Sequence, residues 1–403
     1  MGDVSRREVL IAATAAVAGF AAAHLLRRSR RDGPGDGEAL DDVCGLVRPN
    51  IRKLEPYRCA RDDYDSGVLL DANENAMGAV VDSATPDMHR YPCPYQMPLK
   101  ERVAKFRGVE AENVFVGVGS DEAIDLLFRL FCEPRLDNVV ITPPTYGMYK
   151  VCAAAHDVAV VAAPLVAETF AVDVAAVEAA VTPRTKIVFI CSPGNPTAKS
   201  IPLSVVEQLL KSPKLSRCIL VVDEAYVDFA ATKSAAPLVK KYERLVVLHT
   251  LSKAFGLAAA RVGTAIGDKR VIQYFNNVKA PYSINKLSSA LAVEAFAPKA
   301  LAKLESSVAT LISERTKLRK ALEAKAYVEK VFDSDANFLL FRLKRQDIAK
   351  PLYKALADAG VVIRFRGDQQ HCAGCLRATI GTPAENLALL ALLEKTISNP
   401  PFA

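Results

Sequence analysis

The sequence predicts an α/β fold in which a mainly parallel β-sheet is followed by a smaller C-terminal α+β domain. From about residue 114, short runs rich in Val and Ile alternate with segments of helical periodicity. These runs are continuously apolar, which is typical of parallel strands that are covered on both faces. After about residue 283 the pattern changes to a long helical segment followed by alternating, strand-like segments. The change in pattern indicates two domains, the first with a mainly parallel sheet and the second of the α+β class.

Six apolar runs are the predicted strands of the first sheet: Val114–Val118, Asn138–Ile141, Val158–Ala162, Lys186–Cys191, Ile219–Val222 and Leu245–Leu248. Segments between these runs, including Asp121–Cys132 and Leu203–Lys211, carry the apolar spacing of helices. Because ligands of such sheets bind at the carboxyl ends of the strands, polar residues that follow each run are the candidates for function.

The C-terminal part begins with a predicted helix over Leu301–Lys325. Alternating segments at Asn337–Leu343, Val361–Arg366 and Cys375–Ile380 predict strands, and a helix is expected to end near Gly360. The last helix is expected to open at Thr382-Pro383-Ala384-Glu385, which supplies an N-cap, a proline in the first turn and a capping glutamate.

Composition limits the classes of protein that the chain can be. With 403 residues, 51% of them hydrophobic, it can bury two cores. The formal net charge of +7 forms no basic stripe with interleaved aromatic residues, so nucleic-acid binding is not expected. Nine cysteines without regular spacing favour a reducing compartment, the cytoplasm or a plastid-type organelle, over a disulfide framework. We expect a soluble catalytic domain in such a compartment.

Cys372 and Cys375 form a CxxC motif that is compatible with a redox pair or with half of a zinc site. No second CxxC or suitably spaced histidine pair accompanies it, so ordinary thiols are favoured and no metal site is predicted. The role of the two cysteines stays open.

The N-terminal segment has a pattern of its own. Arg6 and Arg7 precede an alanine-rich apolar run to Leu26, which resembles a twin-arginine export signal, and Ala21-Ala22-Ala23 offers a cleavage site. An organelle presequence, a weak membrane anchor and an alanine-rich helix without a targeting role are alternatives. Membrane contact is expected only through residues 8–26, and the destination is open.

These patterns divide the chain into four regions. Residues 1–43 are a targeting or anchor-like segment with a linker, and residues 44–72 form an arm without periodicity, expected to pack across the domains or on a partner subunit. Residues 73–285 and 286–403 are the predicted large and small domains.

Lys253 is the most informative residue, because it follows closely after the buried run Leu245–Leu248. Desolvation lowers the pKa of an amine, and a neutral amine can attack an aldehyde. The neighbouring run Ile219–Val222 ends in Asp223 and, three residues later, Tyr226. A carboxylate and a phenol suit a pyridinium nitrogen and a phenolate oxygen. Enzymes that use pyridoxal phosphate (PLP) supply a lysine for the Schiff base together with such partners for the cofactor ring.

A phosphate site is expected where the strand Val114–Val118 turns into the next helix at Gly119-Ser120-Asp121-Glu122. Free amides at a helix N-terminus bind phosphate, although a plain helix cap explains the same residues. A dinucleotide fingerprint is incomplete here, because Glu122 stands where the third glycine belongs.

Other polar residues at strand ends are explained either by a structural role or by ligand binding. Tyr146 could stack on a flat ring or simply pack, and Asn195 is explained by turn chemistry or by ligation. Arg364 and Arg377 suit capture of a carboxylate and a phosphate, or are charges at a solvated strand edge. Thr250, Ser252 and Arg261 surround Lys253 in sequence and could reach the cofactor phosphate. Their common placement favours a PLP enzyme.

The motifs also resemble those of the histidinol-phosphate aminotransferases, which are class-II PLP-dependent aminotransferases of fold type I. The resemblance extends from about Val47 to Ile397 and rests on these motifs: Asp71–Asn75, Arg90-Tyr91-Pro92, Gly119–Glu122, Pro144–Tyr149, Ser192–Thr197, Asp223–Tyr226, Thr250–Gly256 and Gly374–Arg377. It implies a large domain with a mainly parallel seven-stranded sheet.

The resemblance also implies roles at the cofactor. Lys253 would form a Schiff base with PLP and move the substrate proton, and Asp223 would keep the pyridine nitrogen protonated. Asn195 and Tyr226 would bind the phenolate oxygen, and Tyr146 would stack on the ring. The cofactor phosphate would be held by Ser120, Asp121, Thr250, Ser252 and Arg261. Tyr91 would reach the cofactor phosphate of the other subunit, which implies a homodimer.

For the substrates, the resemblance implies that Arg377 binds the α-carboxylate of glutamate, that Arg364 and Tyr57 face the substrate phosphate, and that Asn73 lines the entrance. The implied reaction is ping-pong transamination from L-glutamate to imidazole-acetol phosphate, which gives L-histidinol phosphate and 2-oxoglutarate in histidine biosynthesis. Alternatives are an aromatic amino acid aminotransferase, a lyase like threonine-phosphate decarboxylase, and a non-catalytic PLP-binding protein.

Overall fold

The computed structural model describes residues 42–59, 67–82, 87–400 and 402. Residues 43–403 form one compact unit. The twin-arginine motif and the apolar run at 8–26 lie outside the described residues. Among the residues that are described, no helix combines the length and the apolar character needed to cross a membrane.

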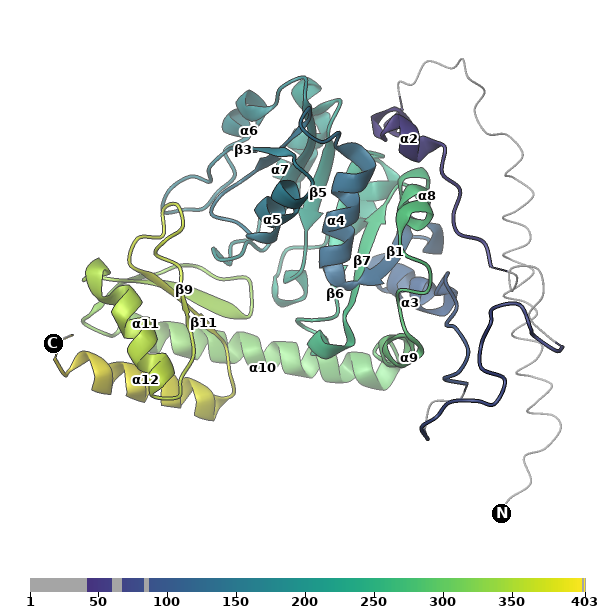
Figure 1. Cartoon of the computed structure of the whole chain (residues 1–403). Coiled ribbons are helices and arrows are strands. Elements are labelled where there is room, and N and C mark those ends of the chain that lie inside the picture. Colours follow the sequence, from purple (N-terminus) through teal and green to yellow (C-terminus); the bar gives the residue numbers. More distant parts are fainter. Residues whose placement is uncertain (1–41, 60–66, 83–86, 401, 403) are drawn as a thin grey trace. The chain divides into compact units, whose positions relative to one another are not determined.

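A seven-stranded sheet forms the centre of the larger part of the unit (Figure 1), with the strand order β1-β7-β6-β5-β4-β2-β3. All neighbouring pairs are parallel except the two that involve β7, so the predicted mainly parallel sheet is confirmed. Its strands are β1 (Val114–Val118), β2 (Asn138–Ile141), β3 (Ala159–Ala162), β4 (Thr185–Cys191), β5 (Ile219–Asp223), β6 (Leu245–Thr250) and β7 (Val262–Gly267). The six predicted strands are all present, with ends that differ by at most two residues.

Strand β7 was not predicted from the apolar pattern. Its sequence, Val262-Gly263-Thr264-Ala265-Ile266-Gly267, is short of large apolar side chains, although all six residues are buried. It lies between β1 and β6 and is antiparallel to both. Small residues are needed there because the start of helix α4 (Gly119–Phe131) lies directly against the strand: a Cβ on Gly263 would collide with the backbone of Gly119 and Ser120.

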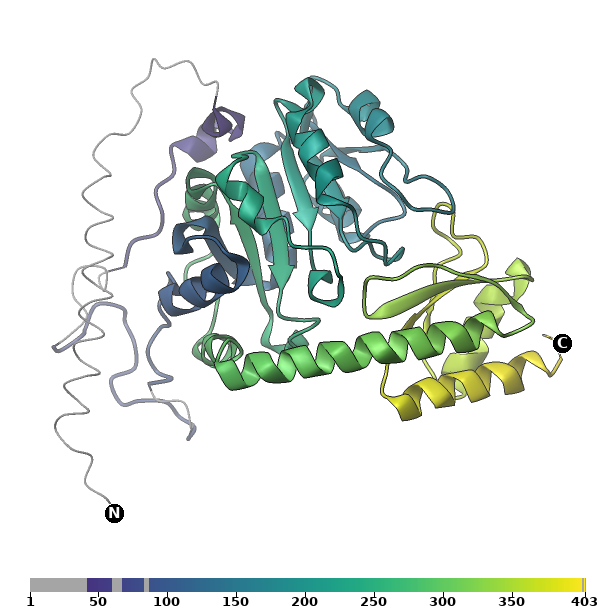
Figure 2. The same cartoon turned by 180° about the vertical axis from the view of Figure 1, so that it is seen from behind.

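Helices cover both faces of this sheet (Figures 1 and 2). Alternate residues of the strands belong to two cores: Phe115 is in the core that includes residues of α4, α5 and α8, whereas Val114 and Val116 are in the core that includes residues of α3 and α7. The helices are α2 (Pro49–Arg52), α3 (Met97–Arg107), α4 (Gly119–Phe131), α5 (Met148–Ala155), α6 (Val174–Ala180), α7 (Leu203–Lys211), α8 (Lys269–Val278), α9 (Lys286–Glu294), α10 (Pro298–Glu323), α11 (Ala349–Asp358) and α12 (Pro383–Ile397).

The expectation that every strand is covered on both faces is wrong for β3. Three of its four residues are exposed, and the strand pairs only with β2. As the last strand of the sheet, it lies beyond most of the helical cover, so its apolar composition reflects β-propensity more than burial.

The second sheet is antiparallel, with the order β10-β11-β9-β8. Its strands are β8 (Val328–Val331), β9 (Phe338–Leu343), β10 (Arg364–Phe365) and β11 (Cys375–Thr379). Helices α10, α11 and α12 pack on one face of it around a separate core. Strand β8 was not predicted. The predicted strand Val361–Arg366 is wrong in length, because the strand in the structure covers Arg364–Phe365 alone.

The start of helix α12 is as predicted. The Thr382 hydroxyl accepts from the Glu385 N–H at 3.3 Å, and the Glu385 carboxylate accepts from the Thr382 N–H at 2.7 Å. None of the nine cysteines is in a disulfide. Cys372 and Cys375 are fully buried in a small core with Phe170 and Phe332.

Candidate active site

Lys253 lies in the turn that follows β6, close to Tyr226 from the loop after β5. Its Nζ atom is 5.6 Å from the centre of the Tyr226 ring. The Lys253 side chain is exposed, yet surrounding protein atoms and then the Arg377 charge lower the pKa of its amine. A lysine with a lowered pKa is neutral more often, which is the state that attacks an aldehyde.

Asp223 is the last residue of β5 and is only 3% exposed. Its carboxylate accepts hydrogen bonds from the Tyr149 hydroxyl at 2.7 Å and from the Ala225 N–H at 3.1 Å. Burial raises the pKa of Asp223, and these two hydrogen bonds oppose the rise. Within the described residues no cation pairs directly with Asp223, so the site is prepared for a positively charged group.

Tyr149 was not among the predicted site residues. It lies on α5, is fully buried, and stacks on Phe189 with ring centres 4.6 Å apart. Burial first, and then the nearby Asp223 carboxylate, keep the pKa of its phenol well above the ordinary value. The phenol therefore stays a hydrogen-bond donor to Asp223. Its position within the Pro144–Tyr149 motif was the only sequence signal for it.

The predicted phosphate loop connects β1 to α4. Gly119 has a φ of +73°, and a Cβ there would lie 2.6 Å from the Arg261 guanidinium. The Gly119 N–H donates to the Arg261 carbonyl at 3.0 Å. The first amides of α4, which include Ser120, have no acceptor within the helix. The start of α4 and Arg261 therefore form one corner with the positive character that suits a phosphate.

The other predicted phosphate and ring residues surround this corner. Tyr146 donates from its hydroxyl to Asp121 at 3.0 Å, and the other Asp121 oxygen is 3.5 Å from Arg261. Because the Asp121 carboxylate is occupied in this way, its backbone N–H is the group that remains for a phosphate. The Thr250 and Ser252 hydroxyls are 3.0 Å apart at the end of β6.

Asn195, which follows β4, and Arg377 of β11 connect the site to the second sheet. Arg377 of β11 donates from its guanidinium to the Asn195 side-chain oxygen and lies 5.1 Å from the centre of the Phe338 ring. The Phe338 ring in turn meets the edge of Tyr226 at 5.1 Å. Burial, followed by the charge of Arg366, lowers the pKa of Arg377 to about 10. The structure thus brings Lys253 and Tyr226 together with residues of the second sheet.

Arg364 and Arg377 are direct partners across the antiparallel pair of β10 and β11. Like charges in such positions repel each other unless an anion lies between or above them. No carboxylate among the described residues forms an ion pair with either guanidinium. The neighbouring Arg366 was not predicted as a site residue, although it lies two positions from Arg364.

Tyr57, Asn73 and Tyr91 lie in the segments before α3, and the two tyrosines contact Tyr282. Tyr91 stacks on Tyr282 at 4.6 Å, and Tyr57 meets the edge of the same ring at 5.7 Å. Asn73 is exposed with a φ of +55°. Tyr57 and Tyr91 are also half exposed. Their roles stay predictions, and Tyr282 is an addition to this group.

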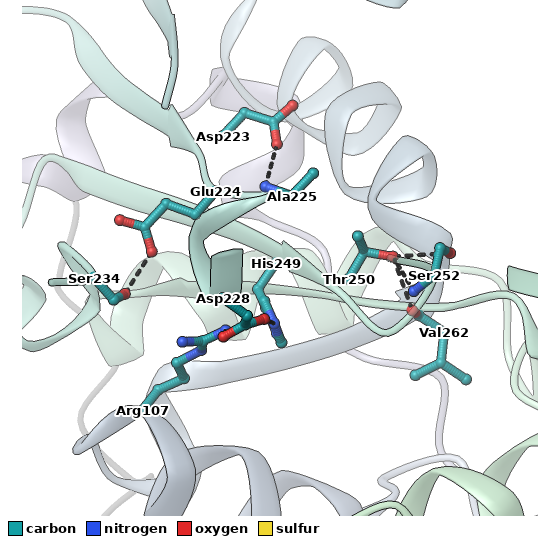
Figure 3. A network of polar contacts seen from close by, with 10 residues as sticks. All are labelled: Arg107, Asp223, Glu224, Ala225, Asp228, Ser234, His249, Thr250, Ser252 and Val262. Atoms are coloured by element: carbon teal, nitrogen blue, oxygen red, sulfur yellow. Dashed lines mark hydrogen bonds and ion pairs between the residues drawn. The ribbon is translucent and has the colours of Figure 1, made fainter. Parts of the chain in front are cut away.

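A buried polar network lies behind the strand ends (Figure 3). The Asp228 carboxylate accepts from Arg107 at 2.7 Å and is 3.1 Å from Nε2 of His249, the residue before Thr250. Burial would raise the pKa of Asp228, but His249 and Arg107 outweigh it and lower the pKa to about 2. This network connects the loop that carries Tyr226 to the strand that leads to Lys253.

The residues present fit pyridoxal phosphate. Asp223 is a buried carboxylate without a cation partner among the described residues, and the corner of Gly119, Ser120 and Arg261 suits a phosphate. Lys253 has the lowered pKa that covalent attachment of an aldehyde requires. Within the described residues no group of three or more His, Cys, Asp or Glu side chains could hold a metal ion.

Comparison with known proteins agrees with this chemistry. Residues 63–393 match the family described as "Aminotransferase class I and II". The chain belongs to this aminotransferase family. The histidinol-phosphate aminotransferase of Saccharomyces cerevisiae is 42% identical over 379 residues, which cover 88% of this chain and 98% of that protein. The enzyme of the same name from Schizosaccharomyces pombe is 40% identical over 88% of this chain and 97% of its own length. The resemblance found in the sequence is therefore confirmed.

Solved structures share the fold of this aminotransferase. A histidinol-phosphate aminotransferase from Sinorhizobium meliloti, solved in complex with pyridoxal-5'-phosphate, has a TM-score of 0.69 at 21% identity, over 81% of this chain and 90% of that chain. A mutant aspartate aminotransferase from Thermus thermophilus has a TM-score of 0.66 at 26% identity, over 77% and 88% of the two chains. The fold-type I architecture predicted from the resemblance is thus confirmed.

Proposed function

We propose that this aminotransferase is a PLP-dependent histidinol-phosphate aminotransferase. It would transfer the amino group of L-glutamate to imidazole-acetol phosphate. The observation that carries the proposal is the pair of guanidinium groups, Arg364 and Arg377, which face each other across β10 and β11 without a carboxylate partner among the described residues. The two substrates of the proposed reaction supply the missing negative charge, because one carries a carboxylate and the other carries a phosphate. The relatives that share about 40% identity carry the same name.

When bound, PLP supplies an electron sink that stabilises negative charge at the substrate Cα. Asp223 would hold the proton at the pyridine nitrogen, and Tyr149 would keep the Asp223 carboxylate in place through its hydrogen bond. Tyr226 and Asn195 would bind the phenolate oxygen. The amides of Ser120 and Asp121, with Thr250, Ser252 and Arg261, would bind the cofactor phosphate, while Tyr146 would cover the ring.

Lys253 would attach the cofactor and then move a proton at the substrate Cα. Its lowered pKa leaves a larger share of neutral amine, which is the form that accepts this proton. Arg377, held by Asn195 and the Phe338 face, would orient the α-carboxylate of glutamate. Arg364 and Tyr57 would face the phosphate of the other substrate, and Asn73 would line the entrance.

The direct test combines purified protein, PLP, histidinol phosphate and 2-oxoglutarate, with glutamate as the measured product. We expect glutamate formation with ping-pong kinetics. Loss of activity in Lys253→Ala, with no loss in Lys299→Ala at an exposed site of α10, ties the activity to the site. Turnover of phenylalanine instead of histidinol phosphate identifies an aromatic aminotransferase. Release of carbon dioxide without 2-oxoglutarate identifies a lyase, and PLP binding without turnover a non-catalytic protein.

We further propose a homodimer in which Tyr91 reaches the cofactor phosphate of the other subunit. The exposed Tyr91, and exposed apolar residues of the same region such as Val68, Leu70 and Met77, support an interface on this side of the chain. Mixing inactive Lys253→Ala with a low-activity Tyr91→Phe variant should restore activity, because one site of each mixed dimer then carries neither change. Failure of the mixture to exceed the sum of its parts contradicts this arrangement.

We keep a reducing compartment as the proposed location, since seven of the nine cysteines are buried as thiols. The N-terminal targeting segment stays a prediction. Sequencing the N-terminus of the mature protein tests it: a start near residue 23 supports cleavage of a signal, and a start at Met1 contradicts it.

A further inference from the structure

Three arginines share one face of the β10–β11 hairpin. Arg364 is opposite Arg377, and the Arg366 N–H donates to the Cys375 carbonyl at 2.9 Å, so the pairing continues beyond Phe365. Side chains alternate along a strand, and directly opposite residues share a face. Arg366 therefore points to the same side as Arg364 and Arg377. Phe365 and its partner Leu376 point to the other side, into the core beneath α11 and α12.

The described residues do not balance the charge of these three arginines. Arg342 of β9 also lies on this face, but that guanidinium pairs with Glu168 at 2.6 Å and with Glu329 at 3.3 Å. In the described part of the chain, Arg364, Arg366 and Arg377 have no such ion pair. Asp368 is the acidic side chain that acts on Arg366, and it stays beyond ion-pair distance. The hairpin thus presents three positive charges that no carboxylate of the described residues neutralises.

The side chain of Arg366 extends toward the site. It is half-buried, and its Nε atom is buried without a hydrogen-bond partner, as is the Nε atom of Arg377. A buried N–H group without an acceptor costs free energy, so such a group indicates an acceptor that binds there. The Arg366 charge also acts on the hydroxyl of Tyr226, lowering its pKa against the rise that burial causes. Both groups therefore face the same space.

The charges of the two substrates indicate which group Arg366 binds. Glutamate carries one negative charge on its α-carboxylate, which Arg377 balances, and one on its γ-carboxylate, which Arg364 balances. A phosphate monoester carries nearly two negative charges at neutral pH and three acceptor oxygens. We propose that Arg366 acts with Arg364 as a specificity-determining residue that binds the phosphate of the phosphorylated substrate. This inference rests on the proposed function, because it presupposes that substrate.

A purely structural role for Arg366 makes a different prediction. Its backbone N–H supports the hairpin whatever the side chain is, so a structural role would affect both substrates of the ping-pong cycle alike. A phosphate-binding role reduces the half-reaction with the phosphorylated substrate more than the half-reaction with glutamate, whose γ-carboxylate carries a single charge. The two half-reactions of the same enzyme therefore separate the explanations.

The test compares Arg366→Gln, Arg366→Lys and the control Arg342→Gln as PLP-loaded full-length proteins. For Arg366→Gln, kcat/KM for histidinol phosphate should fall about 10- to 100-fold, as expected for loss of a hydrogen bond to a charged group. The half-reaction with glutamate should fall less than this, because Arg377 keeps the α-carboxylate and the γ-carboxylate carries one charge, against nearly two on the phosphate. Arg366→Lys, which retains the charge, should recover part of the loss. Inorganic phosphate should inhibit the wild type competitively and Arg366→Gln more weakly.

Arg342→Gln should leave the preference between the two substrates unchanged, since its charge is already paired. Equal losses for both substrates in Arg366→Gln, or unchanged kinetics, overturn the inference while the proposed function stands. If Arg366→Gln does not fold, the Arg366→Lys variant tests the inference through the same comparison of kcat/KM for histidinol phosphate and for glutamate. A wild type that forms no glutamate from histidinol phosphate overturns the proposed function, and the assignment of Arg366 falls with it.

Discussion

The Tyr149 hydroxyl donates a 2.7 Å hydrogen bond to Asp223 Oδ2, between a helix on the face of the sheet and the end of a central strand. Both side chains are buried, and burial raises the pKa of each. The phenol therefore remains protonated and fixes one oxygen of the carboxylate. The residue expected to hold the pyridine nitrogen is thus supported by a partner that the sequence did not identify.

Replacing Tyr149 with Phe should weaken this support while the ring still stacks on Phe189. We expect about 1–3 kcal/mol of lost stability, because a buried carboxylate loses one of its two donors. Cofactor affinity should fall as well, measured by titration of PLP absorbance. Tyr242→Phe is the control, since the Tyr242 hydroxyl binds Glu207 at the surface of α7. Equal effects of the two changes would contradict the role given to Tyr149.

Glu224 should make stability depend on pH. It is 3% exposed, and burial raises its pKa to about 7, against hydrogen bonds from the Ala235 N–H and the Ser234 hydroxyl. The folded state therefore keeps a proton that the unfolded state loses. This contribution to stability is full below pH 4.5 and is lost as the pH rises from about 4.5 to 7. It amounts to roughly 3 kcal/mol, from the conversion of the pKa difference.

Urea unfolding of Glu224→Gln between about pH 4.5 and 8 measures this effect. The variant should lose less stability than the wild type as the pH rises. Glu101→Gln, at an exposed position of α3, should follow the wild-type curve. A Glu224→Gln curve parallel to the wild type across this range would refute the prediction.

The Arg107–Asp228 pair should be costly to break from one side. Its side chains are 8% and 11% exposed, and the two nearest atoms are 2.7 Å apart. Arg107→Met leaves a buried carboxylate with His249 as its remaining partner, so we expect a loss of about 3–5 kcal/mol. The double variant with Asp228→Asn should be more stable than Arg107→Met alone. Additive losses in this double-mutant cycle would show that the pair is not coupled.

Asp228 also predicts acid sensitivity of the opposite sign to that of Glu224. The pKa of Asp228 is lowered from 3.8 to about 2 in the folded protein. Its contribution is therefore present above pH 3.8 and is lost as the pH falls toward 2, by roughly 2 kcal/mol. Asp228→Asn should flatten the stability curve in this acid range, as followed by circular dichroism.

Gly263 should not tolerate a methyl group. A Cβ at this position would overlap the backbone of Gly119 and Ser120, which cannot move away as a flexible side chain could. Gly263→Ala should lower stability by at least about 1–3 kcal/mol and weaken PLP binding, because it displaces the start of α4. Gly267→Ala on the same strand is the control, since its Cβ would lie 3.4 Å from the nearest atom. Normal PLP affinity in Gly263→Ala would remove this argument for the phosphate corner.

Much of the fold could be predicted from the chain. Continuous apolar runs predicted β1 to β6. In all but β3 these runs reflect strands covered on both faces, which need apolar residues at nearly every position. The periodicity failed at β7, where close packing against α4 selects glycine and alanine over large residues. It overestimated β10, because only Arg364 and Phe365 are in the strand, although the partner strand β11 continues to Thr379.

The sequence by itself determined the fold class, the family and the strand ends that carry Lys253, Asp223 and Asn195, because local apolar patterns and motifs specify them. Only the tertiary structure placed Tyr149 against Asp223, His249 against Asp228, and Arg366 on the face of Arg364 and Arg377. These partners come from segments with no shared pattern in the chain. Their pKa values and hydrogen bonds depend on burial and distance, which arise only when the sheets and helices pack.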